Sequence, residues 1–286
     1  MNLTFWQTLF LALLQGVTEL FPISSLGHTV ILPGLLGWGD LVRDKHFLPL
    51  IVALHLGTSI ALVIYFWRDW WKVLLTLANS IKKGEVQIGS ESWVSWLIIL
   101  GCIPAGLLGV FLKDPLEALF ASPPIASAFL IVNGIILFLG EILRRRGSLA
   151  AQKPGISRPL ADLSWKDALL IGLAQSLALI PGISRSGATM VAGLGARLSH
   201  EEAARYSFLL GTPVIGAAAL LEVPQLFGQS AKVVLLVLVG MVIAGVAAFL
   251  STRFLLKYFE TGRLHPFAYY CWGAGILSLI LLLTSR

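Results

Sequence analysis

Long apolar runs separated by short polar loops make up most of this chain. Six of the runs approach the ~20 residues that an α-helix needs to cross a bilayer, whereas a membrane-spanning barrel strand needs only ~10. The six runs lie at about 47–67, 93–112, 123–143, 206–222, 233–251 and 267–284. The pattern therefore predicts an all-α polytopic membrane protein.

Two further apolar stretches, 5–37 and 167–197, are interrupted halfway. Pro, Gly and Ser break them at FPISSLGHT (21–29) and at IPGISRSGAT (180–189). A break at membrane depth leaves backbone N–H and C=O groups unpaired, which is tolerated only where protein or a water-filled cavity satisfies them. We therefore expect each stretch to form a re-entrant helical hairpin.

The two broken stretches align without gaps at an offset of 160 residues. Each is followed by three plain crossings, so the chain divides into repeat 1 (about 5–143) and repeat 2 (about 167–286). A cytoplasmic linker at about 144–166 joins them within a single integral membrane domain, 1–286. The identical pairs are Gln15 with Gln175, Ile23 with Ile183, Ser24 with Ser184, Gly27 with Gly187 and Thr29 with Thr189.

The Lys and Arg residues of the loops predict an orientation, because cytoplasmic loops carry an excess of them. One set of loops holds fifteen Lys and Arg, and the opposite set with the C-terminus holds five. Three crossings separate the hairpins, so the hairpins enter from opposite faces and the repeats have inverted topology. Inverted repeats with discontinuous helices place a binding site near the bilayer midplane. The rich loops are 68–92, 144–166, 197–205 and 252–266.

Composition supports a membrane protein and argues against several other classes. The chain is 57% hydrophobic and 13% charged, which excludes an ordinary soluble domain. Its net charge of +6 comes from short loops and forms no continuous basic stripe, so we expect no nucleic-acid partner. Cys102 and Cys271 lie inside apolar runs and indicate neither a zinc site nor a disulfide.

Glu19 and Arg185 are the acid and the base placed deep in the broken segments. An ionisable group in hydrocarbon costs at least ~2.5 kcal/mol, and such groups usually have a function, although a purely structural Glu–Arg pair joining the halves is the alternative. Around Arg185 lie hydroxyl groups and a glycine that permits close backbone approach: Ser184, Ser186, Gly187 and Thr189. This segment is typical of an anion-binding site.

The opposing segment supplies a second polar group: Ser24, Ser25, Gly27 and His28. Gln15 and Glu19 are one helical turn apart, so both side chains lie on one face. A carboxylate and an amide oxygen together suit a hard divalent cation, Mg²⁺ or Ca²⁺. Acid, hydroxyl, imidazole, guanidinium and metal are the groups that phosphoryl transfer requires.

Two long motifs resemble those of the bacterial undecaprenyl-diphosphate phosphatase family. They are QGVTELFPISSLGH (15–28) and PGISRSGAT (181–189), and HLGTSIALVIYFWRDW (55–70) and ARYSFLLGTPVIGAAAL (204–220) are also similar to family segments. The resemblance implies hydrolysis of undecaprenyl diphosphate to undecaprenyl phosphate and inorganic phosphate. That reaction recycles the lipid carrier for peptidoglycan and is associated with bacitracin resistance. The implied location is the bacterial cytoplasmic membrane.

The resemblance also implies roles for individual residues. Glu19, Ser25, His28 and Arg185 would be catalytic, with Arg185 holding the diphosphate and either Ser25 or His28 attacking it. Glu19 and Gln15 would bind the divalent metal, and Gln15 stands where many family members have Glu, which removes one negative charge. The expected substrate-binding residues are Ser24, Gly27, Ser184, Ser186, Gly187 and Thr189.

The main alternative function is a lipid-phosphate flippase or an ion-coupled transporter, because such proteins also use inverted repeats with broken helices. The two motifs favour hydrolysis. The phosphatidic acid phosphatase superfamily does not fit, because its Ser-Gly-His signature is altered at 25–28 and its other motifs do not follow. We expect membrane lipids as partners, with a homodimer left open. His46, His55 and His265 are expected at interfaces or helix caps.

Overall fold

The computed structural model describes residues 3–112, 122–150 and 158–284, with the side chains of 146–150 left out. Within these ranges every regular element is a helix, and six helices are long and apolar enough to cross a membrane. The predicted all-α fold is thus confirmed for the described residues, and these six helices have the length and composition that the six predicted crossings require. The six are α4 (Phe47–Tyr65), α6 (Glu91–Phe111), α8 (Pro123–Ala150), α11 (His200–Glu222), α12 (Ala231–Phe259) and α13 (His265–Thr284). Residues 113–121 and the 151–157 part of the expected linker lie outside the described residues.

The two interrupted stretches form pairs of short helices, as their Pro and Gly positions predict. The first pair is α1 (Phe5–Thr18) and α2 (Ser25–Leu35), and the second is α9 (Trp165–Ser176) with the short η2 (Leu177–Leu179), followed by α10 (Arg185–Gly195). A serine caps the second helix of each pair: Ser24 Oγ and Ser184 Oγ each accept a backbone N–H three residues on, both at 3.1 Å. These caps satisfy donors that a helix start otherwise leaves unpaired.

The tips of the two pairs touch each other. A Cβ added to Gly27 would lie 2.9 Å from Gly182 Cα, and one added to Gly187 would lie 3.3 Å from Pro22 Cβ. These contacts are reciprocal, since Pro22 and Gly27 stand 160 residues before Gly182 and Gly187. At Gly27 the two breaks meet backbone to backbone, and a Cβ there would be too close to Gly182.

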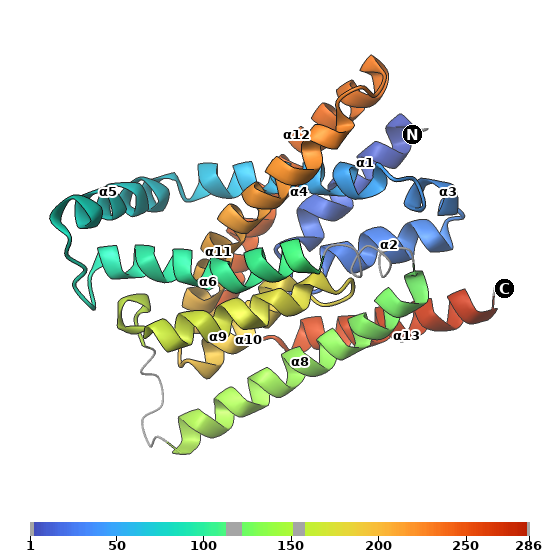
Figure 1. The fold of residues 1–286 in the computed structure, drawn as a ribbon. Helices are drawn as coiled ribbons and strands as arrows, with labels where there is room; N and C mark the ends of the chain where they lie inside the picture. The colour runs from blue at the N-terminus through green and yellow to red at the C-terminus, as the bar shows by residue number, and fades with distance from the viewer. Residues whose placement is uncertain (1–2, 113–121, 151–157, 285–286) are drawn as a thin grey trace.

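The crossings bring the two halves of the chain together. Helix α1 packs against α12, α9 against α6, and α4 against both α11 and α12, while α8 and α13 run side by side (Figure 1). Small residues permit this close approach. A Cβ on Gly16 would lie 2.6 Å from Ala247 Cβ, and one on Gly172 would overlap the Gly101 carbonyl.

The largest apolar core lies around the second pair of short helices and α11. Tyr206 and Phe208 on α11 are 1% and 0% exposed. The Tyr206 hydroxyl donates to the Leu97 carbonyl at 2.9 Å, so its polar end is satisfied inside the core. This packing holds α10, and with it Arg185, against α11.

One expected loop is a helix. Residues 68–92 were expected to form a charged loop, but most of them belong to α5 (Trp67–Lys83). The helix ends at Gly84, which has the left-handed conformation with φ 66°. Helix α5 packs against α6, and Trp96 Nε1 of α6 donates to Ser80 Oγ of α5 at 3.0 Å. It lies beyond α4 at the same end of the molecule as the start of α9, opposite the two chain termini (Figure 1).

Candidate active site

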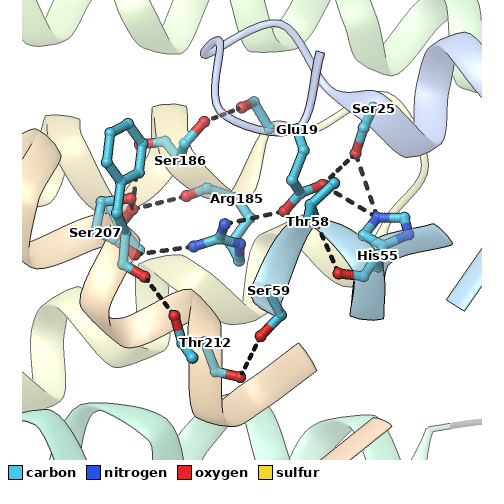
Figure 2. A network of polar contacts seen from close by, with 12 residues as sticks. Glu19, Ser25, His55, Thr58, Ser59, Arg185, Ser186, Ser207 and Thr212 are labelled. Carbon is cyan, nitrogen blue, oxygen red and sulfur yellow. Dashed lines mark hydrogen bonds and ion pairs between the residues drawn. The ribbon is translucent and has the colours of Figure 1, made fainter. Parts of the chain in front are cut away.

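Glu19 is the centre of a buried polar cluster at the first break. It is the C-cap of α1 and only 6% exposed. Its Oε2 accepts from Ser25 Oγ at 2.6 Å, and its Oε1 accepts from Arg185 Nη2 at 2.9 Å (Figure 2). Oε2 also accepts from Gln15 Nε2 at 3.1 Å. The predicted meeting of carboxylate and guanidinium across the two halves is present in the structure. Charge-assisted bonds of this kind are stronger than neutral ones.

Arg185 reaches the cluster from the first turn of α10. Its Nη1 donates to the Ser207 carbonyl on α11 at 2.9 Å, which fixes the guanidinium plane. Gly211 leaves room for it, because a Cβ there would lie 2.5 Å from Nη2 and nearer still to Cζ. Arg185 Nε is buried without a hydrogen-bond partner, so the guanidinium keeps one donor unused.

Ser25 is oriented by an unusual backbone at the residue before it. Ser24 has φ 68° and ψ 96°, one of two non-glycine residues with positive φ in the described part of the chain. Its counterpart Ser184 has an ordinary φ of −84°. Strain of this kind persists where surrounding contacts impose it and concentrates at functional sites. Here it turns α2 so that the Ser25 hydroxyl points at Glu19.

His55 completes the cluster, and the expectation that it lies at an interface or a cap is wrong. It lies in the middle of α4, with Nε2 3.1 Å from Glu19 Oε2 and 3.4 Å from Ser25 Oγ. Its Nδ1 faces the Ile51 carbonyl at 2.8 Å. Both partners, the Glu19 carboxylate and the Ile51 carbonyl, are hydrogen-bond acceptors. The signal in the sequence that could have identified it is a titratable residue inside an apolar run.

His28 does not join the cluster, contrary to our expectation of an imidazole from the same segment. Its Nδ1 faces the Ser24 carbonyl at 2.7 Å, and its Nε2 bonds to the Tyr270 hydroxyl on α13 at 2.9 Å. The rings of His28 and Tyr270 are stacked 5.7 Å apart. The imidazole beside Ser25 and Glu19 is that of His55.

The expected substrate-binding residues lie around the cluster, with their polar atoms engaged inside the protein. Ser186 Oγ donates to the Phe21 carbonyl at 3.2 Å, and Thr189 Oγ1 donates to Ser207 Oγ at 2.6 Å. Ser24 and Ser184 cap helices, and Gly27 and Gly187 form the contact between the tips. These residues build the walls that hold Ser25 and Arg185 in place.

A further bond joins the two crossings beside the site. Ser59 Oγ on α4 donates to the Thr212 carbonyl on α11 at 3.2 Å (Figure 2). Thr58 Oγ1 bonds to the His55 carbonyl at 2.7 Å. The Ser59 bond joins the helix that carries His55 to the helix that supports Arg185, while the Thr58 bond lies within α4.

The residues present fit a divalent cation in part. Gln15 Oε1 is buried without a partner, and the Gln15 amide nitrogen lies 3.1 Å from Glu19 Oε2. The amide nitrogen thus donates to Glu19, whereas a Mg²⁺ ion would take the amide oxygen and would keep several waters or phosphate oxygens as its other ligands. The described residues contain no group of three or more His, Cys, Asp or Glu arranged for a metal. A cation here depends on ligand oxygens from outside the protein.

The arrangement suits reaction at an anionic phosphorus centre. A hydroxyl bonded to a carboxylate is placed to lose its proton as it attacks. Arg185 and the His55 imidazole both contact one carboxylate, Glu19, so N–H donors are already in place to offset negative charge on a phosphoryl group. The unused Arg185 Nε donor and Gln15 Oε1 acceptor are further groups available to such a ligand.

Comparisons with known proteins agree with this chemistry. A family model described as "Bacitracin resistance protein BacA" matches residues 8–277. The chain is 47% identical over 277 residues to an undecaprenyl-diphosphatase of Acidiphilium cryptum, with 95% of each chain covered. It is 43% identical to one of Mycolicibacterium paratuberculosis, covering 98% and 97%, and 46% identical to undecaprenyl-diphosphatase 2 of Burkholderia thailandensis, covering 97% and 96%.

Proposed function

The chain belongs to the bacitracin resistance protein BacA family, and from that premise we propose that it is an undecaprenyl-diphosphatase. It removes the terminal phosphate of undecaprenyl diphosphate and releases undecaprenyl phosphate and inorganic phosphate. The observation that carries the proposal is the Ser25–Glu19–Arg185 cluster, in which a hydroxyl bonded to a carboxylate faces a guanidinium across the two halves. The flippase or transporter alternative is not favoured.

We infer that the two pairs of short helices are re-entrant hairpins of two inverted repeats in the bacterial cytoplasmic membrane. The offset of 160 residues, the reciprocal glycine contacts at the tips and the three crossings after each pair support this inference. With this topology the cluster lies near the midplane, in agreement with inverted-repeat sites in general. The diphosphate then enters the protein while the prenyl chain stays among lipid tails.

Arg185 and His55 bind the diphosphate. The Arg185 guanidinium gives up its bond to Glu19 and bonds to phosphate oxygens instead, because a guanidinium pairs well with phosphate. Its Nε donor, which has no protein partner, is available for a further bond to phosphate. His55 donates from Nε2, which already points into the same space. Charge that develops on the phosphoryl oxygens is offset by groups already in place, and this is usually the largest catalytic effect.

Ser25 is the nucleophile in this proposal, and the bonds of His28 to Ser24 and Tyr270 leave it out of reach. Ser25 Oγ attacks the terminal phosphorus, the bond from phosphorus to the bridging oxygen breaks, and undecaprenyl phosphate leaves with that electron pair. The hydroxyl proton moves to Glu19 Oε2, 2.6 Å away. Water then attacks the phosphoserine, giving inorganic phosphate and restoring the Ser25 hydroxyl with the proton held on Glu19.

A divalent cation, Mg²⁺ or Ca²⁺, held by Glu19 and the Gln15 amide oxygen is part of the proposal. When bound, it would offset the negative charge of the diphosphate. Gln15 Oε1 is the buried oxygen without a protein partner that supports this assignment. Glu19 and Gln15 are one turn apart, so both side chains lie on the same side of α1.

The test is release of inorganic phosphate from undecaprenyl diphosphate by the purified, lipid-reconstituted protein. Arg185→Ala and Glu19→Ala are each expected to lower turnover at least ~100-fold, which corresponds to ~2.7 kcal/mol of transition-state stabilisation. Arg43→Ala, which removes an exposed arginine paired only with exposed Asp40, is the matched control and retains wild-type turnover. Transfer of the lipid across vesicles without phosphate release would contradict the assignment as a hydrolase.

A further inference from the structure

Asn133 is a fully buried polar residue in the middle of the apolar helix α8. It is 0% exposed, and it was not among the residues that the sequence motifs indicated. Its Nδ2 donates to the Pro22 carbonyl at 3.0 Å, and its Oδ1 accepts from the Ser184 N–H at 2.9 Å. Nδ2 also lies 3.3 Å from Cys271 Sγ on α13. One side chain thus bonds to the backbone of both breaks.

The orientation of the Asn133 amide is determined by its partners. The Pro22 carbonyl only accepts and the Ser184 N–H only donates, so a reversed amide would place like groups together at both positions. Unpaired backbone groups at membrane depth are costly, and these two belong to segments that cannot continue a helix. Asn133 therefore donates a hydrogen bond to a carbonyl of the first break and accepts one from an N–H of the second break.

The two bonded groups stand directly beside the reacting side chains. Pro22 lies three residues after Glu19 and three before Ser25, and Ser184 immediately precedes Arg185. Helix α8 packs against both α2 and α10, so it is the common support of the two segments. A shift of either segment relative to α8 changes the position of Arg185 relative to Glu19 and Ser25.

We propose that Asn133 is a positioning residue for the phosphatase reaction: its amide holds the Pro22 carbonyl and the Ser184 N–H so that Arg185 is aligned with Glu19 and Ser25. It touches neither the substrate nor the reacting atoms. The proposal rests on the proposed function for its kinetic consequence. Its structural basis, one hydrogen bond to each of the two breaks, is independent of which substrate binds.

Asn133→Leu tests the alignment, because leucine has a similar size and can make neither bond. We expect kcat to fall at least ~10-fold with KM within about threefold of wild type, since a misplacement of ~1 Å at a catalytic site can lower the rate ~10²-fold. The matched control is Asn79→Leu, the same exchange at an exposed position of α5. The control is expected to retain wild-type kcat.

Asn133→Asp separates alignment from simple packing through a pH profile. A neutral carboxylic acid has one O–H donor and one acceptor oxygen, so it reproduces both bonds, whereas the carboxylate loses the donor to Pro22. The ratio of Asp-variant to wild-type kcat is expected to fall as pH rises, while the Leu-variant ratio stays flat. The ratio removes the titration of groups common to both proteins.

The groups facing position 133 are limited in number. From α13 comes the Cys271 thiol, and the same helix carries Tyr270, which is bonded to His28 of α2. Helix α10, which also packs on α8, carries Arg185, whose guanidinium is paired with Glu19. The recorded hydrogen bonds of Asn133 go to Pro22, Ser184 and Cys271, so in the described part of the chain no acidic or basic side chain bonds to this amide.

Hydrogen–deuterium exchange measures the same bonds without activity. Peptides covering 180–186 are expected to exchange at least ~10-fold faster in Asn133→Leu than in wild type, and to stay protected in Asn133→Asp at low pH. Unchanged exchange and kcat in the Leu variant, or an Asp variant that follows the Leu variant at every pH, would overturn the proposal. A wild-type protein that releases no phosphate would instead refute the proposed function, and exchange would still decide the role of Asn133.

Discussion

Replacing Gly211 by Ala is expected to disable the site while leaving the fold intact. Gly211 lies in α11, and an alanine Cβ there would lie 2.5 Å from Arg185 Nη2 and closer to Cζ and Nη1. Such a separation is well below any contact a real Cβ makes. The atoms that must give way are the far end of a long side chain, so the guanidinium moves and the backbone does not.

The size of the effect follows from the two bonds that hold the guanidinium. Nη1 to the Ser207 carbonyl and Nη2 to Glu19 Oε1 are both 2.9 Å, and a displacement of roughly 1 Å takes them beyond hydrogen-bond reach. A misplacement of this size at a catalytic site corresponds to ~10²-fold in rate, or ~2.7 kcal/mol. Alanine has a helix propensity ~1 kcal/mol better than glycine, which offsets part of the loss in stability.

The assay is phosphate release with a thermal unfolding curve on the same preparation. Gly216→Ala is the matched control, because it is the same exchange in the same helix with no neighbouring atom within 4 Å of the new Cβ. We expect Gly211→Ala to lose at least ~30-fold in kcat/KM with a Tm close to that of Gly216→Ala. Wild-type turnover in Gly211→Ala would refute the placement of Arg185, and a collapse in Tm would refute the view that only the guanidinium moves.

The remaining predictions concern the nucleophile, His55 and the metal. Ser25→Ala is expected to abolish labelling of the protein by substrate with a labelled terminal phosphate, whereas His28→Ala retains it; label lost only in His28→Ala would reverse the assignment. His55→Ala is expected to lower kcat/KM about 10-fold through weaker phosphate binding, and an unchanged value would remove His55 from the site. A chelator is expected to abolish turnover, and Gln15→Glu to lower the Mg²⁺ concentration for half-maximal activity, because a second carboxylate strengthens the site. Full turnover without divalent ions would exclude the cation.

Much of the fold could be predicted from short stretches of the sequence. Six apolar runs of membrane length, and Pro and Gly at the two breaks, are signals contained within short windows, so crossings and interruptions were both predictable. Helix α5 was missed because its charged residues dominated the reading of 68–92. The apolar face of α5 packs on α6, and that packing stabilises α5 in spite of its charges.

The structure brings together the two residues that charge alone singles out. Glu19 and Arg185 are rare charges at membrane depth, and Ser25 follows the first break, so their convergence was expected. The imidazole was assigned to His28, but the structure brings His55 to Glu19 instead. His28 is near in sequence, yet the rotation of α2 about its own axis turns its ring to Tyr270.

Spacing along the chain thus determined where this protein crosses the membrane, where it breaks, and that an acid and a base from opposite halves are buried together. The tertiary structure alone decided that His55 joins them, that Gly211 makes room for the guanidinium, and that Asn133 bonds both breaks. The physical reason is that hydrophobic periodicity reports only on a helix and its nearest surroundings. Which side chains meet across helices depends on how each helix is rotated and shifted against partners a hundred or more residues away.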